Sequence, residues 1–214
     1  MTETATRSED ALRTLLKAWK TPIFQATFPD AAPHNDRLRE LILKVNRAHA
    51  EAANGIGASK SSQRILHWTD PSVAWLTARI RAAATALTTA VLGDVAAEVC
   101  QGFIAEAWAV VYGGGGSLRP HIHHDSPWSG VYYVDTEAID EADEAGYLQL
   151  MDPRPAAVAR QSSVGALRIR PVPGRMVAFP GWVYHSVKAT HPEQGLRISV
   201  AFNVGFDNAW TATS

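Results

Sequence analysis

The residues best suited to chemistry lie in one short stretch, RPHIHHDSPWSG, at positions 119 to 130. It contains His121, His123 and His124, followed directly by Asp125. Alternate residues of a β-strand point to the same face, so either His121 with His123 or His123 with Asp125 would direct two ligands at one point. Neutral imidazoles bind Fe, Zn, Ni or Cu. The stretch therefore predicts a metal site and leaves two choices for its first pair of ligands.

A metal held by two residues of one strand needs a third ligand from elsewhere. The best donor is His185, in the segment FPGWVYHSV. It follows a predicted strand, GRMVAFP, and a Pro-Gly turn that would lead the chain back across the mouth of a barrel. The histidines outside these two segments stand alone, and a surface or hydrogen-bonded histidine is the ordinary explanation for each. The candidate ligand sets are His121, His123 and His185, or His123, Asp125 and His185.

A candidate binding site for an anion lies twelve residues beyond His185, in the strand pattern LRISVAFN. Arg197 and Ser199 fall on one face of this otherwise apolar strand. An arginine that points into a barrel is costly unless an anion pairs with it. A guanidinium beside a hydroxyl is well suited to bind a carboxylate through two hydrogen bonds. The alternative is an edge strand on which Arg197 faces solvent.

Three helices are expected in the first half of the chain. Residues 8–20 begin with capping residues. A second helix, capped by Asn35 or Asp36, is expected to continue to His49, because its apolar positions lie three and four residues apart. Asp70-Pro71-Ser72 is a helix start, and Gly93-Asp94 ends that helix.

The second half of the chain is expected to form strands. Beyond residue 102, short runs rich in branched and aromatic residues are separated by Gly, Pro and Asp turns, which predicts a sheet sandwich or barrel. The Gly- and Ser-rich stretch 54–64 is predicted as a loop, and residues 113–116 as a glycine-rich turn just before the histidines.

Composition excludes several classes of protein. The chain of 214 residues suits one buried core, and its formal net charge of -1 offers no basic surface to nucleic acid or an anionic membrane. Cys100 is the only cysteine, so an internal disulfide and a cysteine-based metal cluster are excluded. No stretch is expected to reach the length of a membrane span, and no signal peptide is recognised, so a cytoplasmic protein is predicted.

Together these residues resemble the Fe(II)- and 2-oxoglutarate-dependent oxygenases, which carry a His-x-Asp pair, a distal histidine and an Arg-x-Ser pair in that order. The chain is similar to one bacterial branch of that superfamily through Tyr112 to His123, SGVYYV, GRMVAFPGWVYHSV and RISVAFN. The resemblance implies an α+β fold, mainly β: a double-stranded β-helix (a jelly-roll or cupin-like barrel) with N-terminal packing helices. It would be a single domain over 1–214, with a helical support region 1–101, the core 102–206 and a tail 207–214.

The resemblance also implies a reaction and its cofactors. Fe(II), 2-oxoglutarate and dioxygen would be used, with Arg197, Ser199 and Tyr112 binding 2-oxoglutarate and no catalytic residue beyond the metal ligands. Decarboxylation of 2-oxoglutarate to succinate would accompany hydroxylation of a small molecule or of a peptide or protein side chain. Neither nucleic acid nor membrane is expected as a partner, and a homodimer is left open.

The superfamily's spacing favours one of the two ligand sets. Many members have Tyr-x-x-Gly with the first ligand histidine nine residues after the tyrosine, and counting from Tyr112 places that histidine at His121. His123 then stands where the carboxylate is expected, as in the branch that this chain resembles. A site of three histidines has a lower ligand charge, which should weaken its affinity for Fe(II). The alternative set replaces His121 by Asp125, in a stretch that also suits a simple turn.

Two other classes of protein share part of the pattern. The broader cupins use Gly-x5-His-x-His, which Gly115 to His123 fits, so a three-histidine cupin that does not use 2-oxoglutarate, either a dioxygenase or an isomerase, is the alternative enzyme. However, the usual cupin glutamate is absent after His123, and cupins have no use for Arg197 and Ser199. A non-catalytic small-molecule binding module is the third candidate.

Overall fold

The computed structural model describes residues 20–49, 51–61, 64–136, 143–153 and 165–207. The helix predicted over residues 8–20 and the tail 207–214 therefore lie almost wholly outside the described residues. In chain order the elements are β1 (Phe24–Thr27), α1 (Ala31–His49), β2 (Glu51–Ala52), β3 (Gly55–Lys60), η1 (Ile65–His67), α2 (Pro71–Leu92), η2 (Gly93–Val95), α3 (Ala96–Val99), η3 (Cys100–Gly102), β4 (Phe103–His121), β5 (Trp128–Asp135), β6 (Leu148–Met151), β7 (Ala166–Ile169), β8 (Arg175–Pro180), β9 (His185–Val187) and β10 (Arg197–Phe206).

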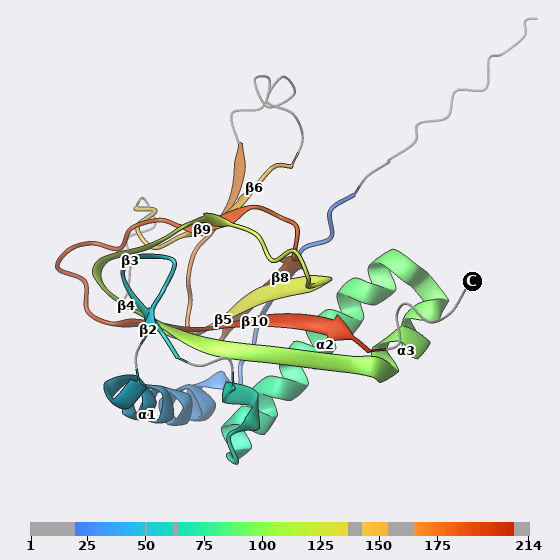
Figure 1. The fold of residues 1–214 in the computed structure, drawn as a ribbon, viewed down its shortest axis with the longest axis horizontal. Coiled ribbons are helices and arrows are strands. Elements are labelled where there is room, and N and C mark those ends of the chain that lie inside the picture. Colours follow the sequence, from blue (N-terminus) through green and yellow to red (C-terminus); the bar gives the residue numbers. More distant parts are fainter. Residues whose placement is uncertain (1–19, 50, 62–63, 137–142, 154–164, 208–214) are drawn as a thin grey trace, which may run out of the picture.

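The strands form one curled antiparallel sheet. Its order is β1-β8-β5-β10-β4-β9-β6-β7, and β3 joins β2 to β4. Strand β4 belongs to both halves, because its first part pairs with β10 and its last residues pair with β9. In Figure 1, α1 and α2 lie on one side of the β5–β10–β4 layer, while β9 and β6 lie on the other. The molecule is thus a half-barrel of strands with two long helices, which is the mainly β architecture that the sequence predicts.

Side chains alternate across the main layer and separate two cores. On β10, Ile198 and Val200 join a core formed with α1 and α2, whereas Arg197 and Ser199 face the hollow of the half-barrel. On β5, Tyr132 belongs to the helix-facing core and Tyr133 to the inner one. This is the two-residue period of a strand with both faces covered. The hollow side is where the predicted site residues meet.

Helix α2 begins and ends where its signals predict. Asp70 accepts a hydrogen bond from the backbone N–H of Ser72 at 2.8 Å, Pro71 occupies the first turn, and Gly93 follows the last turn with φ +60°. Helix α1, by contrast, begins at Ala31, so the predicted start at Asn35 is wrong. The side chain of Asn35 instead accepts a hydrogen bond from the hydroxyl of Tyr132, a sheet contact that local sequence does not reveal.

The run Pro71–Gly102, which starts with α2, is long and apolar enough to cross a membrane by length and composition. The expectation that no stretch reaches such a length is therefore wrong. In this fold Val73, Leu76 and Ile80 are each at most 1% exposed, because this face of α2 packs against the sheet.

Two predicted irregular segments are strands. Residues 55–60 form β3, because their backbone pairs with β4, so the predicted loop over 54–64 is wrong there. The glycine run 113–116 does not separate two strands but lies inside β4, which continues to His121. Gly115 has φ +74°, and a Cβ on Gly114 would lie 2.0 Å from the carbonyl oxygen of Pro192. Glycines therefore let β4 bend closely past the chain without ending, and so carry the histidines into the second layer.

Candidate metal and co-substrate site

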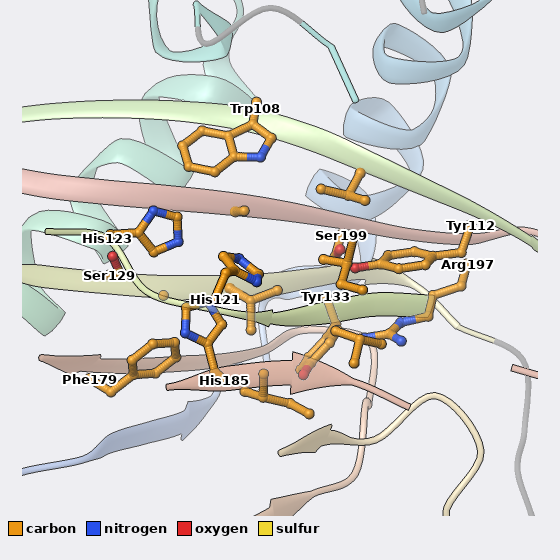
Figure 2. A pocket seen from close by; sticks show the side chains of 17 residues that line it. Trp108, Tyr112, His121, His123, Ser129, Tyr133, Phe179, His185, Arg197 and Ser199 are labelled. Carbon is orange, nitrogen blue, oxygen red and sulfur yellow. The ribbon is translucent and has the colours of Figure 1, made fainter. Parts of the chain in front are cut away.

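Three histidines gather at the open end of the half-barrel. His121 is the last residue of β4 and stands opposite His185, the first residue of β9, while His123 follows in the loop. The backbone N–H of His123 donates to the carbonyl oxygen of Gly181 at 2.8 Å, which fixes that loop beside β9. One ring nitrogen of each histidine lies within 4.8 Å of those of the other two, and Figure 2 shows the three rings facing one another. This spacing allows one metal ion to be held by all three.

Hydrogen bonds orient two of these rings. Nδ1 of His121 lies 2.7 Å from the carbonyl oxygen of Arg119, and Nδ1 of His185 lies 2.9 Å from that of Val183. A carbonyl oxygen only accepts, so each Nδ1 carries the proton and each Nε2 keeps a free lone pair. Support of this kind sets the tautomer of a metal-binding histidine. Both rings are therefore prepared to bind a metal through Nε2.

The alternative ligand does not reach the cluster. Asp125 is exposed and lies in a turn with His124, since β4 has already ended at His121. Across the described part of the chain, the metal-sized group that includes His123 contains His121 and His185 and no carboxylate. The geometry thus favours the three-histidine set, and the assignment of these residues as metal ligands stays a prediction.

Burial keeps two of the histidines neutral. Burial, together with the nearby His121, lowers the pKa of His185 to about 3 and that of His123 to about 4. A neutral imidazole is the form that binds a metal, so at neutral pH neither ring must first lose a proton.

These lowered pKa values predict that the metal-free protein loses stability in mild acid. In the unfolded chain the histidines titrate near 6.5, so between about pH 3 and 6.5 the unfolded state binds more protons. Their contribution is fully present above about pH 6.5 and is lost as the pH falls toward 3. With chelator present, we expect a lower melting temperature at about pH 5 than at about pH 7.5, and a smaller difference in His185→Gln. An equal difference in that variant would contradict this origin.

Arg197 lies at the inner end of the same hollow. Its side chain is 1% exposed, and its guanidinium lies over the rings of Tyr112 and Tyr133, at 4.6 and 5.3 Å from their centroids. Strand β10 is paired on both sides, by β4 and β5, so the alternative of an edge strand with Arg197 in solvent is wrong.

The hydrogen-bonding capacity of this arginine is only partly used. One terminal nitrogen donates to the carbonyl oxygen of Gly146 at 2.7 Å, while Nε has no partner. The hydroxyl of Tyr133 beside it also lacks a partner. No carboxylate from the described residues forms an ion pair with Arg197, so its buried charge is uncompensated. A bound carboxylate would supply both the missing charge and the missing acceptors, so these residues fit the distal carboxylate of 2-oxoglutarate.

One cavity of about 60 Å³ joins the two ends of the site. The three histidines and the pair Arg197 and Ser199 line it together (Figure 2). Its remaining wall is largely apolar, and the buried members of that wall include Val110, Tyr112, Tyr133, Leu148, Phe179 and Val187. The sequence thus predicts six residues that meet in one cavity, at positions 112, 121, 123, 185, 197 and 199.

A second, larger cavity of about 220 Å³ lies against the histidines. It shares His121, His123 and Trp108 with the first, and adds Lys60 of β3 and Asn203 of β10. Trp108 and Asn203 are not among the predicted site residues. However, Trp108 lies an even number of residues from Tyr112 on β4, and Asn203 an even number from Arg197 on β10, so each is expected on the same face as that predicted residue. Lys60 cannot be found in this way, because the composition of its strand predicts a loop.

The aromatic residues near the predicted ligands divide between site and scaffold. Tyr133 lines the cavity, but Tyr132 packs toward the helices and Trp128 donates to Thr88 of α2. Trp182 and Tyr184 are exposed. On β5, the side of the strand separates Tyr133 from Trp128 and Tyr132, whereas Trp182 and Tyr184 lie between β8 and β9.

Fold and site together define a curled, antiparallel half-barrel with a histidine cluster able to hold a metal and a buried arginine able to hold a carboxylate. The sequence model of the family described as "Putative 2OG-Fe(II) oxygenase" matches residues 106–203, which include every predicted site residue. Over these residues, somewhat less than half of the chain, the sequence is similar to the 2OG-Fe(II) oxygenases. A search of curated protein sequences found no significant match.

Solved structures share the fold at low sequence identity. A prolyl-4-hydroxylase from Pseudomonas putida aligns with a TM-score of 0.59 and 19% identity, covering 85% of this chain and 91% of that one. HygX from Streptomyces hygroscopicus, solved with nickel and 2-oxoglutarate bound, aligns with a TM-score of 0.58 and 12% identity over 88% and 84%. A prolyl hydroxylase from Trichoplax adhaerens, in complex with a peptide fragment of hypoxia inducible factor, aligns with a TM-score of 0.61 and 14% identity over 86% and 83%. These likenesses confirm the predicted double-stranded β-helix.

Proposed function

We propose that the protein is a hydroxylase in which His121, His123 and His185 hold Fe(II), and Arg197, Ser199 and Tyr112 hold 2-oxoglutarate. One observation carries the proposal: a buried arginine without an acidic partner among the described residues lines the same cavity as a metal-sized histidine cluster. When bound, iron, 2-oxoglutarate and dioxygen supply an oxidation that releases succinate and carbon dioxide and hydroxylates a C–H bond of the substrate.

The protein's own residues orient the co-substrate and keep water out. The guanidinium of Arg197 fixes one end of 2-oxoglutarate by charge and direction, and the Ser199 hydroxyl lies on the same face of β10. The Tyr112 ring supports the guanidinium from beside it. The apolar wall between Arg197 and the histidines, with Phe179 against His185, leaves little room for water.

We assign the second cavity, beside His121 and His123, to the primary substrate. Its volume of about 220 Å³ fits a small metabolite or one side chain of a peptide. The near-neutral net charge makes a nucleic acid a poor candidate. We expect the enzyme to act in the cytoplasm, where its single thiol, Cys100, stays reduced.

The cupin alternative explains less of the structure. A three-histidine cupin would account for the cluster, but it gives no purpose to a fully buried arginine at the far end of the same cavity that forms no ion pair with the described residues. A metal-free binding module could use the arginine to bind a carboxylate ligand, but it would not account for the preset Nε2 lone pairs of His121 and His185.

The test combines a spectrum with a product. Fe(II) and 2-oxoglutarate added without oxygen should produce a visible charge-transfer band, and admission of air should release succinate from the 2-oxoglutarate. Activity with Fe(II) but without 2-oxoglutarate would favour the cupin alternative. Absence of both band and succinate, in protein shown to be folded, would rule out the hydroxylase.

A further inference from the structure

Behind His123 lies a hydrogen-bonded row of three side chains on three neighbouring strands. Asn203 of β10 stands opposite Glu106 of β4 on one side and opposite Ser129 of β5 on the other. The hydroxyl of Ser129 donates to Oδ1 of Asn203 at 2.6 Å, and Nδ2 of Asn203 donates to Oε1 of Glu106 at 3.0 Å. Asn203 is 8% exposed and Ser129 is 1% exposed.

This row determines which way the Asn203 amide faces. A carboxylate can only accept hydrogen bonds, so the NH₂ group, not the carbonyl oxygen, must face Glu106. The same NH₂ nitrogen lies 3.5 Å from Nδ1 of His123. A flipped amide would place its oxygen against the carboxylate, so the pair holds an N–H group toward Nδ1 of His123.

His123 is therefore supported in the opposite sense from the other two histidines. Nδ1 of His121 and Nδ1 of His185 each face a carbonyl oxygen and donate to it. Nδ1 of His123 faces a donor, so in the neutral ring the proton belongs on Nε2, the nitrogen left to face the cluster. If a metal ion binds Nε2, the proton must move to Nδ1. There it would face the N–H group of Asn203, which is also a donor.

We propose that Asn203, held by Glu106 and Ser129, is a positioning residue that makes His123 the weakest of the three metal ligands. The inference rests on the proposed assignment of His121, His123 and His185 as ligands. Asn203 links Glu106 to His123, and its amide presents an N–H donor to Nδ1, the nitrogen that would have to carry the proton if Nε2 bound a metal. The site therefore has two strong ligands and a third whose strength depends on position 203.

The test transfers the carboxylate from position 106 to position 203, directly beside His123. The double variant Glu106→Gln with Asn203→Asp keeps the number of carboxylates unchanged. Its new carboxylate at position 203 accepts from Nδ1 of His123, from Ser129 and from the new amide at position 106. Co(II), bound by metal-free protein in competition with a chelator, is the probe, because its visible spectrum also reports ligand geometry. We expect the double variant to bind Co(II) tighter by about 10- to 100-fold, the size of effect that such supporting partners have.

Two control variants make the result decisive. Asn35→Asp alters another buried asparagine, also 8% exposed, on the helix side of the sheet, and should leave Co(II) affinity unchanged. His123→Ala should weaken Co(II) binding; an unchanged affinity would overturn the inference. An affinity of the double variant equal to or below that of the wild type, with its melting temperature preserved, would overturn it as well.

If the double variant does not fold, the wild type alone still decides. Nitrogen-15 NMR of histidine-labelled, metal-free protein at neutral pH should show the proton of His123 on Nε2, and those of His121 and His185 on Nδ1. A proton on Nδ1 of His123 would overturn the inference. Neither measurement needs turnover, so a folded protein that binds Co(II) as expected but gives neither the charge-transfer band nor succinate would support the inference and rule out the hydroxylase.

Discussion

Replacing Arg197 by alanine should weaken 2-oxoglutarate binding by on the order of 100-fold or more, because truncating one partner of a buried charge pair costs about 2–5 kcal/mol. The guanidinium is 1% exposed, and we expect the bound carboxylate to be its only counter-ion. Without it, the carboxylate would enter a largely apolar cavity unpaired. The dissociation constant of 2-oxoglutarate, read from the charge-transfer band of the Fe(II) protein without oxygen, measures the effect.

Two further variants separate the effect of the Arg197 charge from that of its hydrogen-bond geometry, and both from the effect of removing an arginine elsewhere in the sheet. Arg197→Lys keeps the charge but loses the two-pronged donor, so its affinity should fall between those of the wild type and the alanine variant. Arg175→Ala removes a half-buried arginine of β8 that bonds to Thr27 and to the carbonyl oxygen of Arg170 and does not line the cavity. It should bind 2-oxoglutarate normally. Unchanged affinity in Arg197→Ala would refute the assigned role.

Replacing His185 by alanine should reduce Fe(II) affinity by more than about 100-fold, since even the partners that support a metal ligand are worth 10- to 100-fold. His185 is buried, neutral at working pH and preset by Val183 to offer Nε2. No other described histidine, cysteine or carboxylate lies close enough to replace it in the cluster. Metal content after dialysis against limiting Fe(II), and competition with a chelator, measure the loss.

The turn beside the cluster provides matched controls. His124→Ala removes an exposed histidine that neighbours His123 in sequence but lies outside the cluster, and Asp125→Ala removes the alternative ligand. Both should bind Fe(II) like the wild type, whereas His121→Ala should behave like His185→Ala. Loss of Fe(II) in Asp125→Ala with none in His121→Ala would reverse the choice between the two ligand sets.

Local rules predicted much of the fold and most of the site. Asp70, Pro71 and Gly93 bound α2 because capping depends on residues a few positions apart. Arg197 and Ser199 share a face because strand geometry repeats every two residues. By contrast, residues 55–60 have loop-like composition and form a strand only because β4 offers them backbone partners.

The family model matches the range that contains the predicted site residues, and the fold decides how those residues are oriented. Asn203 lies on the same face of β10 as Arg197, which strand geometry predicts. Its contacts, however, are with Glu106 and His123, which are 97 and 80 residues away in the chain. Contacts between strands that are distant in sequence set the direction of its amide. No spacing rule within one segment contains that information.

By itself, the sequence determined the types of ligand and their spacing: two histidines on one face of a strand end, a distal histidine, and an arginine with a serine on one face of another strand. Only the tertiary structure shows that His121, and not Asp125, lies beside His123 and His185. The reason is where β4 ends: pairing with His185 keeps the backbone extended as far as His121, and the turn that follows carries Asp125 out to solvent. The length of a strand depends on its partner, and that partner is 64 residues away in the chain.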